Sequence, residues 1–469
     1  MVHLAEVRIL SATGMLGTGF PEESLRLGLE MKPHMIGCDA GSTDSGPTDL
    51  ATGSCRYSEE AYRRDLRLLL AAAITHEIPL IIGSAGGAGG DKNVDWTRNI
   101  LEEVAAELNL EMRLAVIYSG QNKEWLKRKV AEGRTHPLPN CPPIDDTLID
   151  ESMTIVGMMG AEPIQAALTA GANVVLAGRA TDTSVFAALP LLLGAKPGLA
   201  WHAAKILECG AAAVEHRPTP DCMFATIRDE EIILQAPNPA LRCTPTSVAA
   251  HSLYENGDPF HVVEPSGTLD TTKSEYVAID DRTVRITGSE FIEADRYTIK
   301  LEGTRLAGYQ TVVIAGLRDP IILEQLDEFI GSCQVSIATR VSQNYPDLTS
   351  DSWSIRYRVY GRDGVLGPLE PHANVVGHEV GLVIEVTAGT QQIASKIASI
   401  ARHQTLHQSV PAWSGFLSNI ALPYGSNDLV RGAVYEFNMN VVIEPDSPEE
   451  MFRTELVELK AMASIGGTN

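Results

Sequence analysis

Short apolar runs alternate with helical patterns through the first 210 residues of the chain. Apolar residues at helical spacing lie between several of these runs, over residues 57–73, 97–108 and 163–170. Such alternation is typical of parallel strands that are joined by right-handed helical crossovers. We therefore predict a mostly parallel, doubly wound sheet in a Rossmann-like α/β domain over residues 1–215. The expected strands lie at residues 7–10, 35–38, 79–83, 114–118, 154–156 and 173–177.

The pattern changes after about residue 215. Runs of β-branched and aromatic residues then follow one another up to residue 314, with one helical pattern at residues 247–254. Residues 216–345 are therefore expected to form a mixed, strand-rich section, which is either a domain of its own or an elaboration of the first. From residue 346 to residue 469, the order strand, strand, helix, strand predicts a small α+β section.

Chain length and cysteine content bear on the number of units and on the compartment. A chain of 469 residues is long for one hydrophobic core, which favours two or three compact units and makes a homo-oligomer the expected state. The seven cysteines include no Cys-x-x-Cys pair, as expected in a reducing compartment. The sequence shows neither a secretory leader pattern nor an apolar run of about 18 residues. We therefore expect a cytoplasmic protein with no membrane partner.

The chain is strongly acidic, with 37 Lys and Arg residues against 60 Asp and Glu residues and a formal net charge of −23. This excess opposes the backbone of nucleic acids and anionic lipid surfaces, so we expect no nucleic-acid partner either. An anionic substrate would have to be bound by local backbone donors and by a few well-placed cations.

Polar, glycine-rich loops follow several of the expected strands. In a parallel sheet such loops converge on one edge, which is where ligands bind. The loops therefore predict a shared substrate site, although Gly, Ser and Asp also suit ordinary turns. The expected substrate-binding residues are Asp39, Ser42, Thr43, Ser84, Gly86, Gly87, Gly89 and Arg179.

The glycine-rich loop GSAGGAGGDK, residues 83–92, matches no nucleotide-binding motif in register. Asp91 and Lys92 stand where the P-loop and dinucleotide motifs require a closing glycine. Its backbone N–H groups could instead hold an oxyanion, a carboxylate or a phosphate, and a structural loop is the alternative. The sequence thus contains no nicotinamide or P-loop signature, and it leaves the cofactor unknown.

Three residues are candidates for acid–base catalysis, and a fourth could bind the substrate. Asp44, flanked by hydroxyl groups, is a candidate catalytic acid or base, and Asp182 is a candidate general base or a helix N-cap. Arg179 could hold a substrate carboxylate in bidentate fashion. His251 is a further catalytic candidate or a structural histidine. No zinc-type histidine spacing occurs, so no metal site is assigned, although Mg²⁺ remains open.

Several long strings, taken in order, carry a family resemblance. They are GCDAGSTDSGP, VVLAGRATDTSVFAA, KILECGAAA, SVAAHSLYENGDPFHVVEPSGTLD and YTIKLEGTRLAGYQTVVIAGLRDP. From about residue 7 to about residue 459, the chain resembles the acyclic terpene utilisation AtuA family. The resemblance implies a role in the catabolism of branched, carboxylated carbon chains, such as the acetate-releasing cleavage of a branched hydroxyacyl-CoA. Longer relatives carry a C-terminal ferredoxin-like module, which we do not expect in a chain of this length.

Three functions are compatible with these residues. The first is a lyase or hydratase that acts on a branched or hydroxy carboxylate, as the free acid or as an acyl-CoA, with Asp44 or Asp182 as the base. The second is a hydrolase in which Asp39 and Asp44 hold a divalent metal that activates water. The third is a non-catalytic binding subunit of a multi-enzyme assembly.

Overall fold

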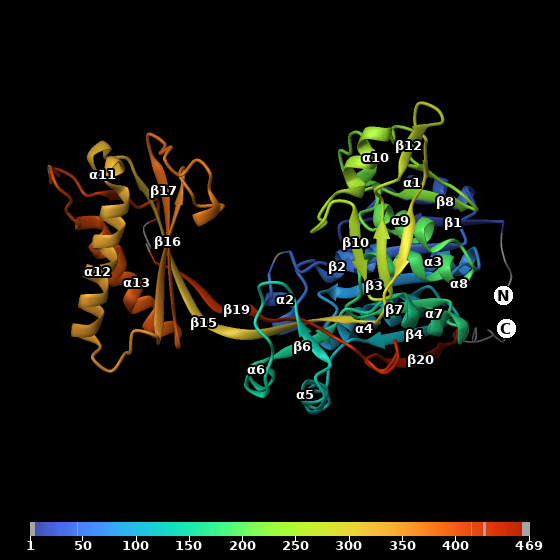
Figure 1. Cartoon of the computed structure of the whole chain (residues 1–469), viewed down its shortest axis with the longest axis horizontal. Helices are drawn as coiled ribbons and strands as arrows, with labels where there is room; N and C mark the ends of the chain where they lie inside the picture. The colour runs from blue at the N-terminus through green and yellow to red at the C-terminus, as the bar shows by residue number, and fades with distance from the viewer. Residues whose placement is uncertain (1–4, 45, 414, 425–427, 462–469) are drawn as a thin grey trace, which may run out of the picture. The chain divides into compact units, whose positions relative to one another are not determined.

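The computed structural model describes residues 5–44, 46–413, 415–424 and 428–461 (Figure 1). The chain forms two compact units. Unit 1 contains Met1–Arg305 and Phe437–Asn469, and unit 2 contains Leu306–Glu436. The three sections expected at 1–215, 216–345 and 346–469 follow changes in sequence texture, and they stay a prediction. Their boundaries at residues 215 and 345 fall inside the units.

Unit 1 is built on a ten-stranded sheet with a parallel centre. Its central strands pair in parallel in the order β1, β2, β3, β7 and β4, with helices between them along the chain. The prediction of a mixed α/β fold with an N-terminal, mostly parallel sheet is therefore confirmed. The central strands are β1 (Glu6–Ser11), β2 (Met35–Gly41), β3 (Leu80–Gly87), β7 (Val174–Ala177) and β4 (Met112–Tyr118).

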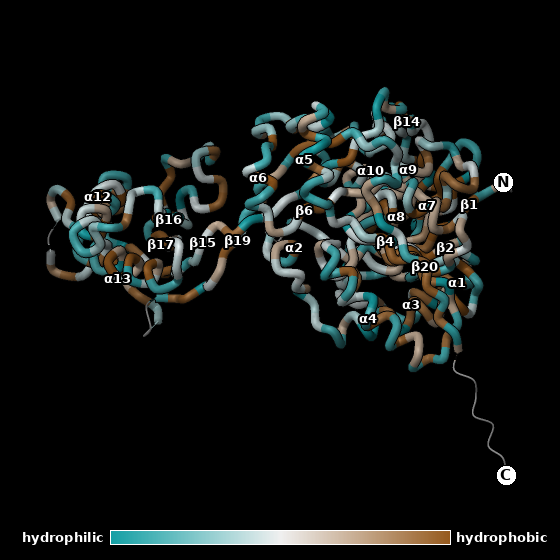
Figure 2. Tube along the Cα trace, turned by 90° about the horizontal axis from the view of Figure 1, so that it is seen from below, coloured by the Kyte–Doolittle hydropathy of each residue, from teal (hydrophilic) through white to brown (hydrophobic). Residues whose placement is uncertain are grey.

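Helices cover both faces of this sheet, because successive residues of its buried strands point to opposite sides. In β3, Leu80 and Ile82 belong to one hydrophobic cluster, whereas Ile81 belongs to the other. The first cluster includes residues of α1 (Glu22–Glu30), α3 (Glu59–Thr75) and α4 (Asp91–Glu107). The second includes residues of α7 (Ala161–Thr169), α8 (Asp182–Leu192) and α9 (Pro197–Leu207). Figure 2 shows hydrophobic segments gathered around these strands and helices.

Antiparallel strands extend the sheet at both edges. β8 pairs with β1 over its full length, with Ile9 opposite Ala225, and β20 pairs with β4. Much of the expected middle section is therefore an elaboration of the first sheet. The added strands are β8 (Met223–Arg228), β9 (Ile232–Gln235), β13 (Val284–Thr287), β12 (Glu275–Ala278) and β20 (Arg453–Leu459). A separate sheet contains β10 (His261–Glu264), β11 (Gly267–Asp270) and β14 (Glu290–Glu293), and α10 spans Pro245–Ser252.

One expected strand of the parallel sheet lies elsewhere. β6 (Thr154–Gly157) pairs antiparallel with β15 (Ile299–Leu317), and this pairing places Val156 opposite Glu302. The reason is that β7 already lies between β3 and β4, while the outer edge of β4 is taken by β20. No free edge of the parallel strands therefore remains for β6.

Unit 2 has the element order β-α-β-β-α-β of a ferredoxin-like fold. Its strands lie in the order β16, β17, β15 and β19, and β17 pairs antiparallel with both of its neighbours. The expectation that the chain holds no such module is wrong, since residues 306–345 supply its first strand and helix. The elements are the C-terminal part of β15, α12 (Leu326–Asn344), β16 (Trp353–Tyr360), β17 (Val380–Ala388), α13 (Gln391–His407) and the N-terminal part of β19 (Asp428–Ile443).

Shorter elements complete both units. In unit 1 they are α2 (Thr48–Thr52), α5 (Lys123–Ala131), β5 (Thr135–Pro137), α6 (Asp146–Glu151) and a 3₁₀ turn at Ala211–Ala213. In unit 2 they are α11 (Pro320–Glu324), a 3₁₀ turn at Gly367–Leu369 and β18 (Ile420–Ala421). Across the described ranges, no helix combines the length and the apolar character needed to cross a membrane.

Candidate functional site

Arg179, directly after β7, brings together the loops that follow several strands of the parallel sheet. Its Nη1 donates to Ser84 Oγ at 3.3 Å and its Nη2 to Thr43 Oγ1 at 3.4 Å. Its backbone N–H donates to Ser119 Oγ at 2.8 Å. Residues that follow β2, β4 and β7 and one from the C-terminal half of β3 therefore meet around one buried guanidinium group, in the arrangement that a parallel sheet favours.

Glu302 of β15 is the ionic partner of Arg179. Arg179 Nε lies 2.9 Å from Glu302 Oε2, and both side chains are buried. Lys300 Nζ lies 3.2 Å from the other carboxylate oxygen. Burial alone would raise the pKa of Glu302, but Arg179 and Lys300 hold that pKa below its ordinary value. Glu302 is not among the residues expected from the sequence, and it already binds one edge of the guanidinium group that is expected to hold a substrate carboxylate.

Asp182 is the most accessible carboxylate beside Arg179. It is the first residue of α8, and 42% of its side chain is exposed. The N-cap is Thr181, whose Oγ1 accepts from the Ser184 N–H at 3.3 Å, so the N-cap alternative for Asp182 is wrong. Asp182 Oδ1 lies 3.7 Å from Arg179 Nη1. Desolvation by the surrounding loops raises the pKa of Asp182, and Arg179 opposes that shift.

Asp39 lies buried near the end of β2, and its charge interacts with that of Asp182. Its Oδ1 accepts from the Ala40 N–H at 2.8 Å and from the Gly41 N–H at 3.4 Å. Burial, reinforced by the neighbouring Asp182 carboxylate, raises the pKa of Asp39 well above its ordinary value. The site thus combines a buried carboxyl group that favours its protonated form with a more exposed one.

Asp44 lies in an exposed position of the loop after β2. Its backbone N–H donates to Ser42 Oγ at 3.1 Å, and the Ser42 carbonyl accepts from Arg56 at 2.9 Å. The Asp44 charge is one of the groups that raise the pKa of Asp182. Ser45, from the same loop, lies outside the described residues. Across the described chain, no three His, Cys, Asp or Glu side chains are grouped so that they could hold a metal ion.

The glycines at the end of β3 and directly after it allow close backbone packing. Gly86 and Gly89 have φ of +68° and +69°. A Cβ on Gly86 would lie 2.4 Å from the Asn93 carbonyl oxygen, and one on Gly89 would lie 2.3 Å from the Arg179 backbone nitrogen. Gly87 accepts from the Ser42 N–H at 3.0 Å. These glycines therefore let the loop hold Arg179, while the proposed binding of an anion by their N–H groups stays a prediction.

A second buried ion pair lies between Lys205 of α9 and Glu208. Lys205 Nζ is 2.6 Å from Glu208 Oε1, and the side chains are 6% and 8% exposed. Burial raises the pKa of Glu208 to about 8, although Lys205 opposes the shift. The positive charge of Lys205 also helps to keep the pKa of Asp182 down. The sequence signal for this pair is two charged residues in the otherwise apolar string WHAAKILECGAAA.

His251 of α10 is buried near this pair. Its ring stacks on Tyr254, with centroids 5.6 Å apart, and its Nε2 has no hydrogen-bond partner in the described part of the chain. Burial lowers the pKa of His251 to about 4, and the charges of Lys205 and Arg217 add to this effect. His251 is therefore neutral near pH 7, with one ring nitrogen unsatisfied.

Glu264 of β10 adds a further buried carboxyl group that the sequence analysis missed. Its oxygens accept from Thr181 Oγ1 at 2.7 Å and from Thr183 Oγ1. Burial raises the pKa of Glu264 to about 7, while the two threonine hydroxyl groups oppose that shift. Glu264 thus supports the turn that positions Asp182.

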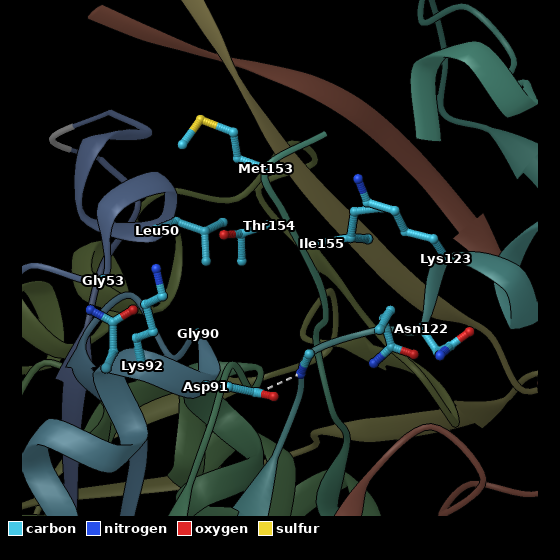
Figure 3. Close-up of a pocket in the computed structure, with 13 residues that line it drawn as sticks. Leu50, Gly53, Gly90, Asp91, Lys92, Asn122, Lys123, Met153, Thr154 and Ile155 are labelled. Carbon is cyan, nitrogen blue, oxygen red and sulfur yellow. Dashed lines mark hydrogen bonds between the residues drawn. The ribbon is translucent and has the colours of Figure 1, made fainter. Parts of the chain in front are cut away.

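A cavity of about 370 Å³ borders the far end of the glycine-rich loop (Figure 3). Gly90, Asp91 and Lys92 at the start of α4 line it, together with Gly120. Asp91 Oδ1 accepts from the Gly120 N–H at 2.8 Å, the contact dashed in Figure 3. Within the described ranges Lys92 forms no ion pair. The start of a helix beside an unpaired ammonium group favours an anionic ligand.

Comparison with known proteins gives a family for the part of the chain that contains Arg179 and Asp182. No curated protein and no solved structure matches the chain. The model described as acyclic terpene utilisation family protein AtuA matches residues 44–215. Over residues 44–215, therefore, this chain is similar to the acyclic terpene utilisation AtuA family.

Proposed function

We propose that the protein is a lyase or hydratase that acts on a branched or hydroxy carboxylate, as the free acid or as its CoA thioester. The family is implicated in acyclic terpene utilisation, which is the context for such a substrate. The observation that carries the proposal is the pair of carboxyl groups, Asp39 and Asp182, beside the Arg179–Glu302 ion pair. Two carboxyl groups in different environments are suited to separate acid and base roles.

Loss of a β-hydroxyl group and retro-aldol cleavage need a base, an acid and donors for a developing enolate. Asp182 is the proposed base, since its side chain is 42% exposed and can reach a substrate. Asp39 is the proposed general acid, which supplies the proton that the leaving oxygen needs. Asp44, at the exposed edge, could assist either step, and His251 could accept or donate a hydrogen bond through Nε2.

Hydroxyl groups beside Arg179 are the proposed enolate donors. Thr43 Oγ1 and Ser84 Oγ accept hydrogen bonds from the guanidinium group. A hydroxyl group that accepts from a cation can still donate its own O–H, and the cation strengthens that donation. The Ser84 O–H donates to the Ala180 carbonyl at 3.4 Å, an acceptor that an enolate oxygen would replace. If the substrate is a thioester, the cavity beside Lys92 could hold an anionic part of it. We also retain the homo-oligomer as a proposal.

The test is product analysis on a panel of branched hydroxy acids and their CoA thioesters. We expect dehydration, hydration or carbon–carbon cleavage by the purified protein, and loss of turnover in Asp182→Asn. Asp281→Asn, an exposed change of the same type, is the matched control. Full turnover by Asp182→Asn would remove Asp182 from its role. Binding without turnover would favour the non-catalytic subunit, and chelator-sensitive release of a free acid would favour the hydrolase.

A further inference from the structure

A cavity in unit 2 has a basic lining, although the chain as a whole is acidic. It has a volume of about 430 Å³ and is lined by residues from α12, from the Tyr345 that follows it and from α13. Three basic side chains, Arg340, Lys396 and Arg402, line it together with His403. No Asp or Glu residue is among the described residues that line it. In a chain with a net charge of −23, this is a local concentration of positive charge.

Two of these cations are not neutralised within the described part of the chain. Arg340 is exposed and forms no ion pair there. Lys396 Nζ lies 5.6 Å from the centroid of the Tyr345 ring, a cation–π contact that leaves its charge uncompensated. Arg402 differs, because its Nε lies 3.0 Å from Asp428 Oδ1. The cavity therefore keeps positive charge available on both helices.

Gln404 gives an independent sign of a missing acceptor. Its Nε2 is buried and has no hydrogen-bond partner among the residues that the structure describes, and Gln404 lines the same cavity. A buried donor without an acceptor is energetically costly, so such groups usually have a partner. A ligand rich in acceptor oxygens would fit both this donor and the neighbouring cations.

We propose that this cavity binds the phosphate group of a soluble phosphorylated small molecule. A single carboxylate can be satisfied by one arginine, whereas phosphate accepts from donors in several directions. Arg340 and Lys396 approach from different helices, which suits phosphate. The volume exceeds that of one phosphate group, and Ile400 and the Tyr345 ring offer a surface for the organic part. The proposal concerns unit 2 alone and does not depend on the reaction proposed for unit 1.

Calorimetric titration of the full chain with pyrophosphate at low ionic strength tests this proposal. We expect saturable binding that is at least about tenfold weaker in Arg340→Gln/Lys396→Gln. The matched control is Arg318→Gln/Arg356→Gln, which removes the same charge from exposed positions outside the cavity. The control should bind like the original protein. No saturable binding, or equal weakening in both double variants, would overturn the proposal.

Two further measurements separate a built site from a general charge effect. Gln404→Leu keeps the charge but removes the unsatisfied donor, so it should weaken pyrophosphate binding without lowering the stability of the free protein. Unchanged binding in this variant would exclude Gln404 from the site. Vesicles that contain phosphatidic acid provide the other arm. Binding to the vesicles without binding to pyrophosphate would point to a lipid surface and refute a soluble ligand.

Discussion

Arg179 Nε and Glu302 Oε2 lie 2.9 Å apart, and their side chains are only 7% and 6% exposed. The two residues are 123 positions apart in the chain. Their ion pair connects the loop after β7 to β15. At this point β15 pairs with β6. The buried ion pair beneath the candidate site therefore depends on a strand outside the parallel sheet.

The first prediction concerns the stability of this pair. Arg179→Gln or Glu302→Gln removes the main partner of a buried charge and leaves it only the half-exposed Lys300 or Asp182, so each should lower the free energy of unfolding by about 3–5 kcal/mol. Urea denaturation at pH 7 measures the change. Arg26→Gln is the control, because its partner Glu23 is exposed and such pairs contribute about 0–1 kcal/mol. Equal losses in all three variants would contradict the special role of the buried pair.

The loops around Arg179 could be predicted because the carboxyl ends of parallel strands meet at one edge of a sheet. Thr43, Ser84 and Asp182 lie there, although the sequence does not show which contacts they form. Glu302 could not be placed in the same way. Its position depends on β6 pairing with β15, and that pairing depends on which sheet edges other strands leave free. The available signal was a lone acid within the strand pattern YTIKLEG.

The ferredoxin-like unit illustrates a related limit. Residues 306–345 contain the first strand and helix of this unit, but they fall in the expected middle section because the texture of the sequence changes only near residue 346. Adjacent elements of one fold can differ in their pattern of apolar and polar residues. The pattern of a strand reveals only which of its own two faces is buried. In β17 every second residue is buried, which fits one covered face and does not indicate the partner strands.

The second prediction concerns Gly89. Gly89→Ala should be much more destabilising than Gly133→Ala, although the two glycines have φ of +69° and +71°. A Cβ at Gly133 meets no atom within 4 Å, so that change costs only the backbone strain, about 1 kcal/mol. A Cβ at Gly89 would also lie 2.3 Å from the Arg179 nitrogen. Thermal unfolding compares the variants, and similar melting temperatures would disprove the close approach.

The third prediction concerns His251 and acid. The folded protein holds the pKa of His251 at about 4, below its ordinary value of 6.5. The unfolded chain therefore binds a proton first as the pH falls, and stability is lost between about pH 6.5 and pH 4. His251→Gln should lack this part of the loss, whereas His216→Gln, an exposed control, should keep it. Denaturation at several pH values measures the difference, and parallel curves for all three proteins would refute a buried neutral imidazole.

The fourth prediction separates a functional role of Asp39 from a structural one. Burial raises the pKa of Asp39 well above its ordinary value of 3.8, so the folded protein retains a proton that the unfolded chain loses. The stability of the original protein should therefore fall as the pH rises above about 4, until the folded group also ionises. Asp39→Asn has no proton to lose at this position, so it should gain stability relative to the original protein over that window.

The gain should be present at pH 7 and should vanish near pH 4, as followed by denaturant unfolding. If Asp39 is also the general acid of the proposed reaction, the same variant should be more stable and yet lose turnover. A stabilised variant with full turnover would assign Asp39 to the fold alone. A variant without the pH-dependent gain would show that the carboxyl group is ionised in the folded protein, and that result would remove the physical basis for the proposed acid.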